Sequence, residues 1–406
     1  MSDLSASSVL SAHKSTPTEA DWFQIAEDVA ASLKKTAVAR ERVAATPRAE
    51  VAELRASGLL TLLNPKDTGG ANARFTDAFR VVRILARADT SIAQLLSYHY
   101  LLSHSAFWRA EPDQRRRLVL QSVEQKWFWG GASNPREALP TLTLDGDGFR
   151  LNGRKTFASN ASLADRITVR VAFGDVPVFI VVDGTRTGTV HGNDWDAFGQ
   201  RLTESGSIEF RDVRVDRDHI LGPFPPRLND PPPPQATLVV PIHQLLFVNL
   251  YLGTAEGALL DANDYVRTRT KPWQTSGVDK ASDDPYILEL YGCLHSELRA
   301  SVALAEVGAS EIEAAIERAG ALRPEERTAV AATVYAAKVN STRVALEITS
   351  RIFELMGARS TSARYGFDRF WRNIRTHSLH DPVAYKAREV GNFALNGRIT
   401  PDPLYT

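Results

Sequence analysis

The sequence predicts an α+β protein in three parts: a helical domain, a β domain and a second helical domain. Apolar residues recur at spacings of three and four from about residue 22 to 125 and again from 237 to 395. Between these regions, short alternating or β-branched runs are separated by turn dipeptides. We therefore expect an N-terminal helical domain at 1–125, a middle antiparallel β domain at 126–234 and a C-terminal helical domain at 235–406.

The first helical domain is expected to follow a short tail. Residues 1–20 have neither the basic start nor the apolar core of a secretory signal, so they are expected to be a mobile tail. Asp89, Thr90 and Ser91 precede the apolar run 92–102, and one of them is expected to act as the helix N-cap.

The β domain is expected to end in a proline-rich segment. Asp145-Gly146 and Asn152-Gly153 are turn signals between the expected strands. Residues 222–234 contain seven prolines, which exclude a regular helix or a central strand. We place the boundary to the last domain here.

The C-terminal domain is expected to consist of long helices. One of them begins after Arg323-Pro324 and ends at Gly357, a plausible C-cap. The longest apolar stretch, 238–252, does not have the make-up of a membrane span. It is interrupted by Pro241, His243, Gln244 and Asn249.

Composition excludes several classes of function. Lys and Arg number 48 and Asp and Glu number 48, so the net charge gives no reason to expect nucleic acid or an acidic membrane as partner. The single cysteine, Cys293, cannot form an intrachain disulfide, which fits a reducing cytoplasm best. Rossmann, P-loop, hydrolase-elbow and zincin motifs are all missing from the sequence.

The densest group of candidate site residues is 357–381, with five arginines among aromatic side chains. Such a cluster can bind phosphate and stack on flat rings, although a solvated helix face is the alternative for any single arginine. His377, His380 and Asp381 would share one face if this segment were helical, as proton transfer would need. A packed helix junction is the other interpretation. A metal would need a further ligand cluster, and none stands out, so no metal is predicted.

Other candidates lie in the first part of the expected β domain. The aromatic run 127–129 gives way to the small residues 130–133, which would let a backbone approach a planar ligand. Ser159 could hydrogen-bond the edge of a ligand, or simply cap a turn.

Four segments of the chain resemble one known family: 151–157, 193–207, 247–273 and 365–386. They resemble the acyl-CoA dehydrogenase fold and, more narrowly, the reduced-flavin-dependent monooxygenases built on it, nearest the dibenzothiophene monooxygenase family. The resemblance implies FMN, received as FMNH2 from a separate NAD(P)H:flavin reductase, together with O2. It also implies a homotetramer.

Residue roles follow from the same resemblance. It implies catalytic roles for Tyr98, Ser159, His377, His380 and Asp381. It implies flavin contacts from Tyr98, Gly131, Ser133, Ser159, Trp195, Lys271 and Arg359, with Arg359 reaching over from a neighbouring subunit. It implies a substrate pocket lined by Gln94, Trp129 and Phe157. At three of these positions, Gln94, Gly131 and Lys271 stand where the family has histidine, asparagine and arginine.

The activity implied by the resemblance is oxygenation of a small organic molecule through a C4a-hydroperoxyflavin, preferably at sulfur. Oxygenation of an amine nitrogen or aromatic carbon is the alternative on the same fold. An FAD-dependent acyl-CoA dehydrogenase is a third hypothesis, although residues 376–381 lack the glutamate base of that reaction. A non-catalytic protein of the same shape is the last.

Overall fold

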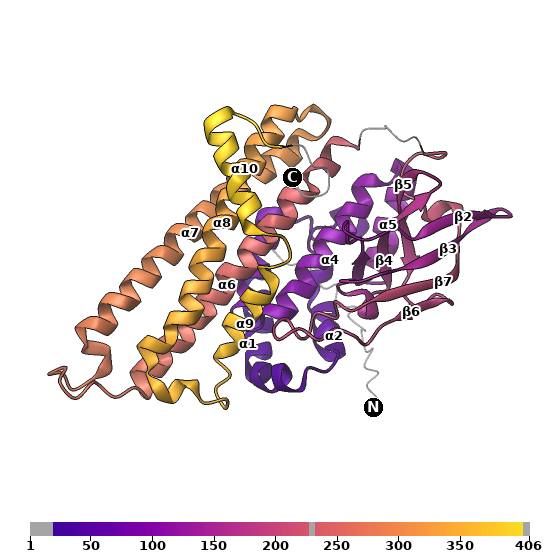
Figure 1. Ribbon diagram of the computed structural model, residues 1–406. Coiled ribbons are helices and arrows are strands. Elements are labelled where there is room, and N and C mark those ends of the chain that lie inside the picture. The colour runs from indigo at the N-terminus through magenta and orange to yellow at the C-terminus, as the bar shows by residue number, and fades with distance from the viewer. Residues whose placement is uncertain (1–18, 227–231, 401–406) are drawn as a thin grey trace, which may run out of the picture.

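The computed structural model describes residues 19–226 and 232–400, coloured along the chain in Figure 1. Most of the tail expected at 1–20 lies outside the described residues. The first helical part contains α1 (Glu19–Val43), α2 (Arg48–Ser57), α3 (Phe75–Ala86), α4 (Thr90–Arg109) and α5 (Pro112–Glu124). Of the three candidate N-caps of α4, Asp89 is the one that caps the helix, because its carboxylate accepts a hydrogen bond of 3.1 Å from the Ile92 backbone N–H.

A seven-stranded sheet follows the first helices. Its strands are β1 (Trp129–Ala132), β2 (Thr141–Asp145), β3 (Gly148–Lys155), β4 (Arg166–Phe173), β5 (Val176–Asp183), β6 (Thr189–His191) and β7 (Ile208–Val215). Most neighbouring strands are antiparallel, as expected, but β4 pairs in parallel with β1 and, at one position, with β2. Alternation of apolar residues reports which face of a strand is buried and not the direction of its neighbour, so the parallel pairs were not predicted.

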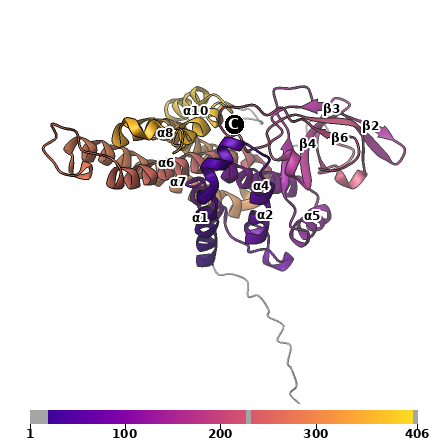
Figure 2. The same ribbon diagram turned by 90° about the horizontal axis from the view of Figure 1, so that it is seen from below.

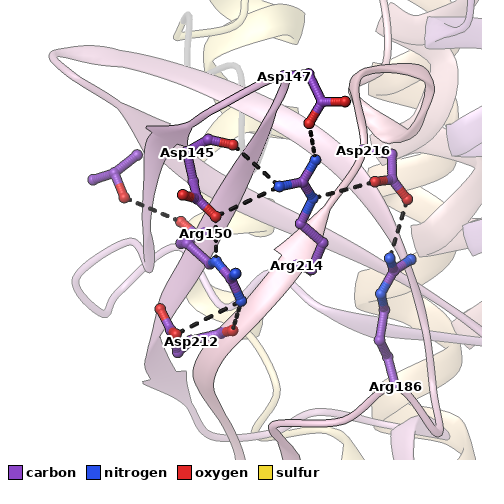
Figure 3. Close-up of polar contacts among 8 residues, drawn as sticks. Asp145, Asp147, Arg150, Arg186, Asp212, Arg214 and Asp216 are labelled. Atoms are coloured by element: carbon purple, nitrogen blue, oxygen red, sulfur yellow. Dashed lines mark hydrogen bonds and ion pairs between the residues drawn. The ribbon is translucent and has the colours of Figure 1, made fainter.

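Arginine–aspartate pairs join the neighbouring strands β2, β3 and β7 (Figure 3). Arg150 of β3 contacts Asp145 of β2 at 2.6 Å, and Arg214 of β7 reaches Asp145 at 3.5 Å and Asp216 at 3.4 Å. These pairs are largely exposed to solvent, so they support the strand register more than they stabilise the fold.

The C-terminal part is a helical bundle built around one apolar helix. It contains α6 (Val239–Thr268), α7 (Pro285–Arg318), α8 (Pro324–Met356), α9 (Asp368–His377) and α10 (Val383–Asn396). As predicted, helix α8 begins after Arg323 and ends before Gly357. Gly357 has a φ of 79°, which glycine adopts easily. Seen from below, the sheet lies to one side of the helices, with α4 and α5 beside it (Figure 2).

Helix α6 corrects the expectation that residues 238–252 lack the make-up of a membrane span. By length and composition alone, the helical segment Pro234–Thr268 is apolar enough to cross a membrane, with a mean hydropathy of 1.5 in its best window. However, 78% of that window is buried inside the protein, where α6 packs against α3, α4, α7 and α8. The apolar character of α6 is therefore accounted for by its place in the core.

Candidate active site

A cavity of about 1040 Å³ lies between α4, the sheet, the start of α6 and the segment after α9. It brings together most of the candidate residues named from the sequence. Those that line it are Gln94, Tyr98, Gly131, Ser133, Phe157, Ser159, Trp195, His377 and His380. Pro232 and Pro234, from the described part of the proline-rich segment, also line it.

Helix α4 supplies one wall of the cavity. Gln94, Tyr98, Leu102 and Ser105 follow at intervals of three or four residues, so their side chains form one stripe along the helix. The Tyr98 ring meets the His243 ring edge-on, with centroids 5.3 Å apart. Burial raises the pKa of the Tyr98 hydroxyl well above its usual value, so this group stays protonated and can donate a hydrogen bond.

The sheet side of the cavity combines small hydroxyls with two aromatic rings. The Ser159 and Ser205 hydroxyl oxygens are 2.8 Å apart. Phe157 has a φ of 52° and is 64% exposed, and its ring meets that of Trp195 with centroids 6.1 Å apart. A bulky residue with positive φ and an exposed ring is unusual, and such strain is typical of a binding site.

Three imidazoles gather at the end of the cavity near α6. Helix α9 ends at His377, so the helical face expected for residues 377–381 does not form. A turn brings His380 back instead, with the rings of His377 and His380 6.1 Å apart. The third ring belongs to His243 of α6, 5.4 Å from His380. The sequence did not assign His243 to the site, although its place as a polar residue in an apolar helix was a signal.

A buried hydrogen-bond chain lies behind His377. The Tyr251 hydroxyl is 2.8 Å from His377 Nδ1, and Lys338 Nζ donates to that hydroxyl at 3.0 Å. A protonated ammonium can only donate, so the Tyr251 oxygen accepts from Lys338, and the arrangement that also satisfies the Tyr251 hydrogen is donation to Nδ1. The neutral His377 ring then carries its hydrogen on Nε2, a buried atom at the cavity wall with no hydrogen-bond partner among the described residues.

The charge states of this chain follow from its burial. Burial, and then the positive charge of Lys338, hold the pKa of His377 well below its usual value, so the imidazole is neutral at physiological pH. Burial also lowers the pKa of Lys338 to about 8, although Asp381 opposes this shift. Lys338 is therefore mostly protonated at neutral pH. It was not identified from the sequence, where one lysine in a helix usually indicates a solvated position.

Asp381 lies behind the imidazoles and does not line the cavity. Its carboxylate is 3.3 Å from His380 Nδ1, 4.0 Å from Lys338 Nζ and 3.9 Å from Lys386 Nζ. Burial alone would raise the pKa of Asp381, but the hydrogen bond to His380 and the charge of Lys338 outweigh it and hold the pKa well below its usual range. Asp381 is thus placed as a buried counter-ion for two lysines.

Three further candidates lie away from the cavity. Trp129 is fully buried, and its indole N–H donates to Ser122 Oγ at 2.7 Å. Lys271 and Arg359 are exposed beyond the last turns of α6 and α8, where Thr270 Oγ1 bonds the Met356 carbonyl at 3.1 Å. His243 lies in the first turns of α6, and a helix of this length spans about 45 Å, so neither cation reaches the cavity of its own chain.

Gly131 allows α4 and β1 to approach each other. A Cβ atom at this position would lie 2.6 Å from Leu102 Cδ2, closer than real contacts. No group of three or more His, Cys, Asp or Glu side chains in the described ranges is arranged to hold a metal ion.

The architecture and the site together define the acyl-CoA dehydrogenase fold. The chain matches the acyl-CoA dehydrogenase N-terminal domain family over residues 23–125 and the corresponding C-terminal domain family over residues 245–384. Butyryl-CoA dehydrogenase from Megasphaera elsdenii shares this fold with a TM-score of 0.79 at 18% identity.

The more similar proteins are monooxygenases. The chain is 38% identical to dibenzothiophene monooxygenase of Mycolicibacterium goodii, covering 95% of this chain and 96% of the relative. It is also 38% identical to the probable FMNH2-dependent monooxygenase SfnC of Pseudomonas putida, over 94% and 96% of the two chains.

Two solved structures agree with these relatives. Methanesulfinate monooxygenase MsuC of Pseudomonas fluorescens superposes with a TM-score of 0.89 at 37% identity, covering 94% of this chain and 99% of the other. TdsC of a Paenibacillus species, solved with FMN and indole, gives 0.90 at 37% identity over 95% and 100%. The chain belongs to the FMNH2-dependent monooxygenase family built on the acyl-CoA dehydrogenase fold, which confirms the resemblance found in the sequence.

Proposed function

We propose that this protein uses FMNH2 and O2 to add one oxygen atom to a small organosulfur compound. The observation that carries the proposal is the make-up of the cavity wall: three imidazoles line it, and none of its described lining residues is Asp or Glu. An acyl-CoA dehydrogenase needs a carboxylate base at this wall to remove the substrate α-proton. The relatives that act on dibenzothiophene and methanesulfinate support sulfur as the oxygenated atom.

The cavity fits FMN. A flavin ring needs donors and acceptors along its edge, and the wall offers buried polar atoms without partners: Gln94 Oε1, Gln200 Nε2 and His377 Nε2. We infer that Ser133, Ser159, Trp195 and Phe157 hold the ring on the sheet side, with Gly131 next to them. When bound, reduced FMN supplies the two electrons that activate O2.

The residues of the chain then protect and orient the reaction. In this proposal Tyr98 and His377 present O–H and Nε2–H donors to the reacting oxygen. His380, oriented by the Asp381 carboxylate at 3.3 Å, holds or delivers a proton there. Phe247, whose ring centroid is 4.3 Å from that of His377, excludes water beside the imidazoles.

The test is the coupling between flavin oxidation and product formation. Purified protein is supplied with FMNH2 by a flavin reductase and NADH, and sulfoxide product and hydrogen peroxide are both measured with a panel of organic sulfides, amines and aromatic compounds. We expect a sulfide to give product in proportion to NADH consumed, and His380→Ala to lower the product and raise peroxide. The proposal is wrong if every compound gives only peroxide while an acyl-CoA thioester reduces the bound flavin without O2.

We also propose a homotetramer, a separate reductase and a cytoplasmic location. Exposed apolar side chains on α7, Tyr286, Leu288 and Val307, support burial against another copy. The exposed Cys293 makes no disulfide, which suits a reducing compartment. In the tetramer, Lys271 and Arg359 would bind the flavin phosphate of a neighbouring subunit.

The shared site can be tested by subunit mixing. Arg359→Ala and His380→Ala subunits are each expected to couple poorly, and mixed assemblies are expected to regain part of the activity. Native mass spectrometry gives the number of subunits. Mixed assemblies without any recovery would count against a flavin site shared between subunits.

A further inference from the structure

The lining of the cavity is strongly cationic. Five of its lining residues are arginines: Arg109, Arg136, Arg170, Arg323 and Arg327. None of the described lining residues is acidic, although Arg323 contacts Glu326 at 2.9 Å outside the wall. A cavity that only had to hold a neutral molecule would not need this charge, because a partly buried guanidinium loses hydration without gaining an anion.

Arg109 and Arg170 both neighbour Phe179 in the cavity wall, since Arg170 of β4 pairs with Phe179 of β5. Arg109 ends α4, and its guanidinium stacks on the Phe179 ring at 4.2 Å. Its Nη1 donates to the Ser105 carbonyl at 2.9 Å and the Ser105 hydroxyl at 2.5 Å, which fixes its position and leaves Nε and Nη2 for a ligand. Burial, and then the charge of Arg170, lower the pKa of Arg109 to about 10. Neither arginine makes an ion pair with a carboxylate in the described parts of the chain.

We propose that Arg109 and Arg170 bind an anionic group of the substrate, so that the substrate is an organosulfur anion whose charged group is remote from the reacting sulfur. This inference rests on the proposed function. The Arg109 guanidinium lies level with Ser105, which is seven residues along α4 from Tyr98, or about 10 Å. Between these two positions the wall is apolar, formed by Leu101 and Leu102.

The geometry therefore defines a substrate with two ends. Its sulfur lies among Tyr98, His243 and His380, an apolar body crosses Leu101 and Leu102, and its carboxylate or sulfonate accepts hydrogen bonds from the two guanidinium groups. Oxygenation of a sulfide forms one S=O bond. The second oxygen atom of O2 leaves as water with the two electrons and two hydrogens of FMNH2, and the anionic group is unchanged.

The experiment compares para-(methylsulfanyl)cinnamate with its neutral amide, which differ in charge and hardly in shape. Dissociation constants are measured by calorimetry on protein loaded with oxidised FMN, and sulfoxide is measured in turnover. We expect the carboxylate to bind at least ~10-fold more tightly than the amide, since hydrogen bonds to charged groups are strong. Arg109→Gln and Arg170→Gln are each expected to remove most of that preference without changing FMN affinity.

Controls separate the possible failures. Arg117→Gln makes the same charge change on exposed α5 and is expected to keep the preference. Should Arg109→Gln fail to fold, Arg170→Gln and the charge-retaining Arg170→Lys still test the pair. Equal affinity for the carboxylate and the amide would overturn the inference. A loss of FMN affinity in both glutamine variants would also overturn it, because the two arginines would then bind the flavin phosphate. A preserved preference with peroxide as the only product from every sulfide would count against the proposed function instead.

Discussion

The hydroxyl of Tyr251 gives the sharpest test of the buried hydrogen-bond chain. Tyr251→Phe removes the atom that joins Lys338 Nζ, at 3.0 Å, to His377 Nδ1, at 2.8 Å, and keeps the aromatic ring. The ammonium would still lie 4.5 Å from the centroid of that ring, so packing should change little. What remains is a buried cation with the Asp381 Oδ1 atom 4.0 Å away, and an imidazole nitrogen that has lost its donor.

The expected loss of stability follows from these two unsatisfied groups. Each buried polar atom left without a partner costs about 1–3 kcal/mol, and more when it is charged. We therefore expect the free energy of unfolding to fall by about 2–5 kcal/mol. The control is Tyr100→Phe, which removes one buried hydrogen bond of 2.8 Å to the Leu59 carbonyl and should cost only about 0.5–1.5 kcal/mol.

Urea unfolding of both variants measures the difference, and the peroxide-to-product ratio gives an independent readout. In Tyr251→Phe the hydrogen of His377 is no longer held on Nε2, so we expect more peroxide per flavin oxidised. Tyr100→Phe should couple as well as the unmodified protein. The reasoning is refuted if Tyr251→Phe is as stable as Tyr100→Phe and produces no more peroxide.

Three further predictions concern the same framework. Folding lowers the pKa of Lys338 from 10.5 to about 8, so between these pH values the unfolded chain binds more protons than the folded protein. The free energy of unfolding should therefore rise across this pH range by up to about 3 kcal/mol. This rise should be missing in Lys338→Met. Asp89→Ala and Asp89→Asn both lose the 2.6 Å ion pair to Arg40, but asparagine can still cap α4, so alanine should be less stable by roughly 0.5–2 kcal/mol in thermal unfolding. Gly131→Ala forces its Cβ against Leu102 and should lower the free energy of unfolding by about 1–3 kcal/mol. The double variant with Leu102→Ala should lose less stability than the sum of the two single changes. Simple additivity of the two losses would contradict the contact.

The cavity shows where prediction from sequence succeeded and where it stopped. Gln94, Tyr98, Phe157 and Ser159 were named from the resemblance and do line one cavity. His243 was noticed only as an interruption of an apolar stretch, because nothing local to residue 243 shows that α6 passes beside residues 377–380. The interruption was a usable signal, since a polar group inside a core helix needs a reason to be there.

The sequence by itself determined the order of helices and strands, the start of α4 within residues 89–91 and the limits of α8, because each depends on residues within a few positions of one another. Only the tertiary structure decided which polar groups meet. Lys338 and Tyr251 are 87 positions apart, and Arg109 and Arg170 stand on a helix end and a mid-sheet strand. Their charge states and hydrogen-bond directions depend on burial and on distances across the fold, which no local pattern of residues encodes.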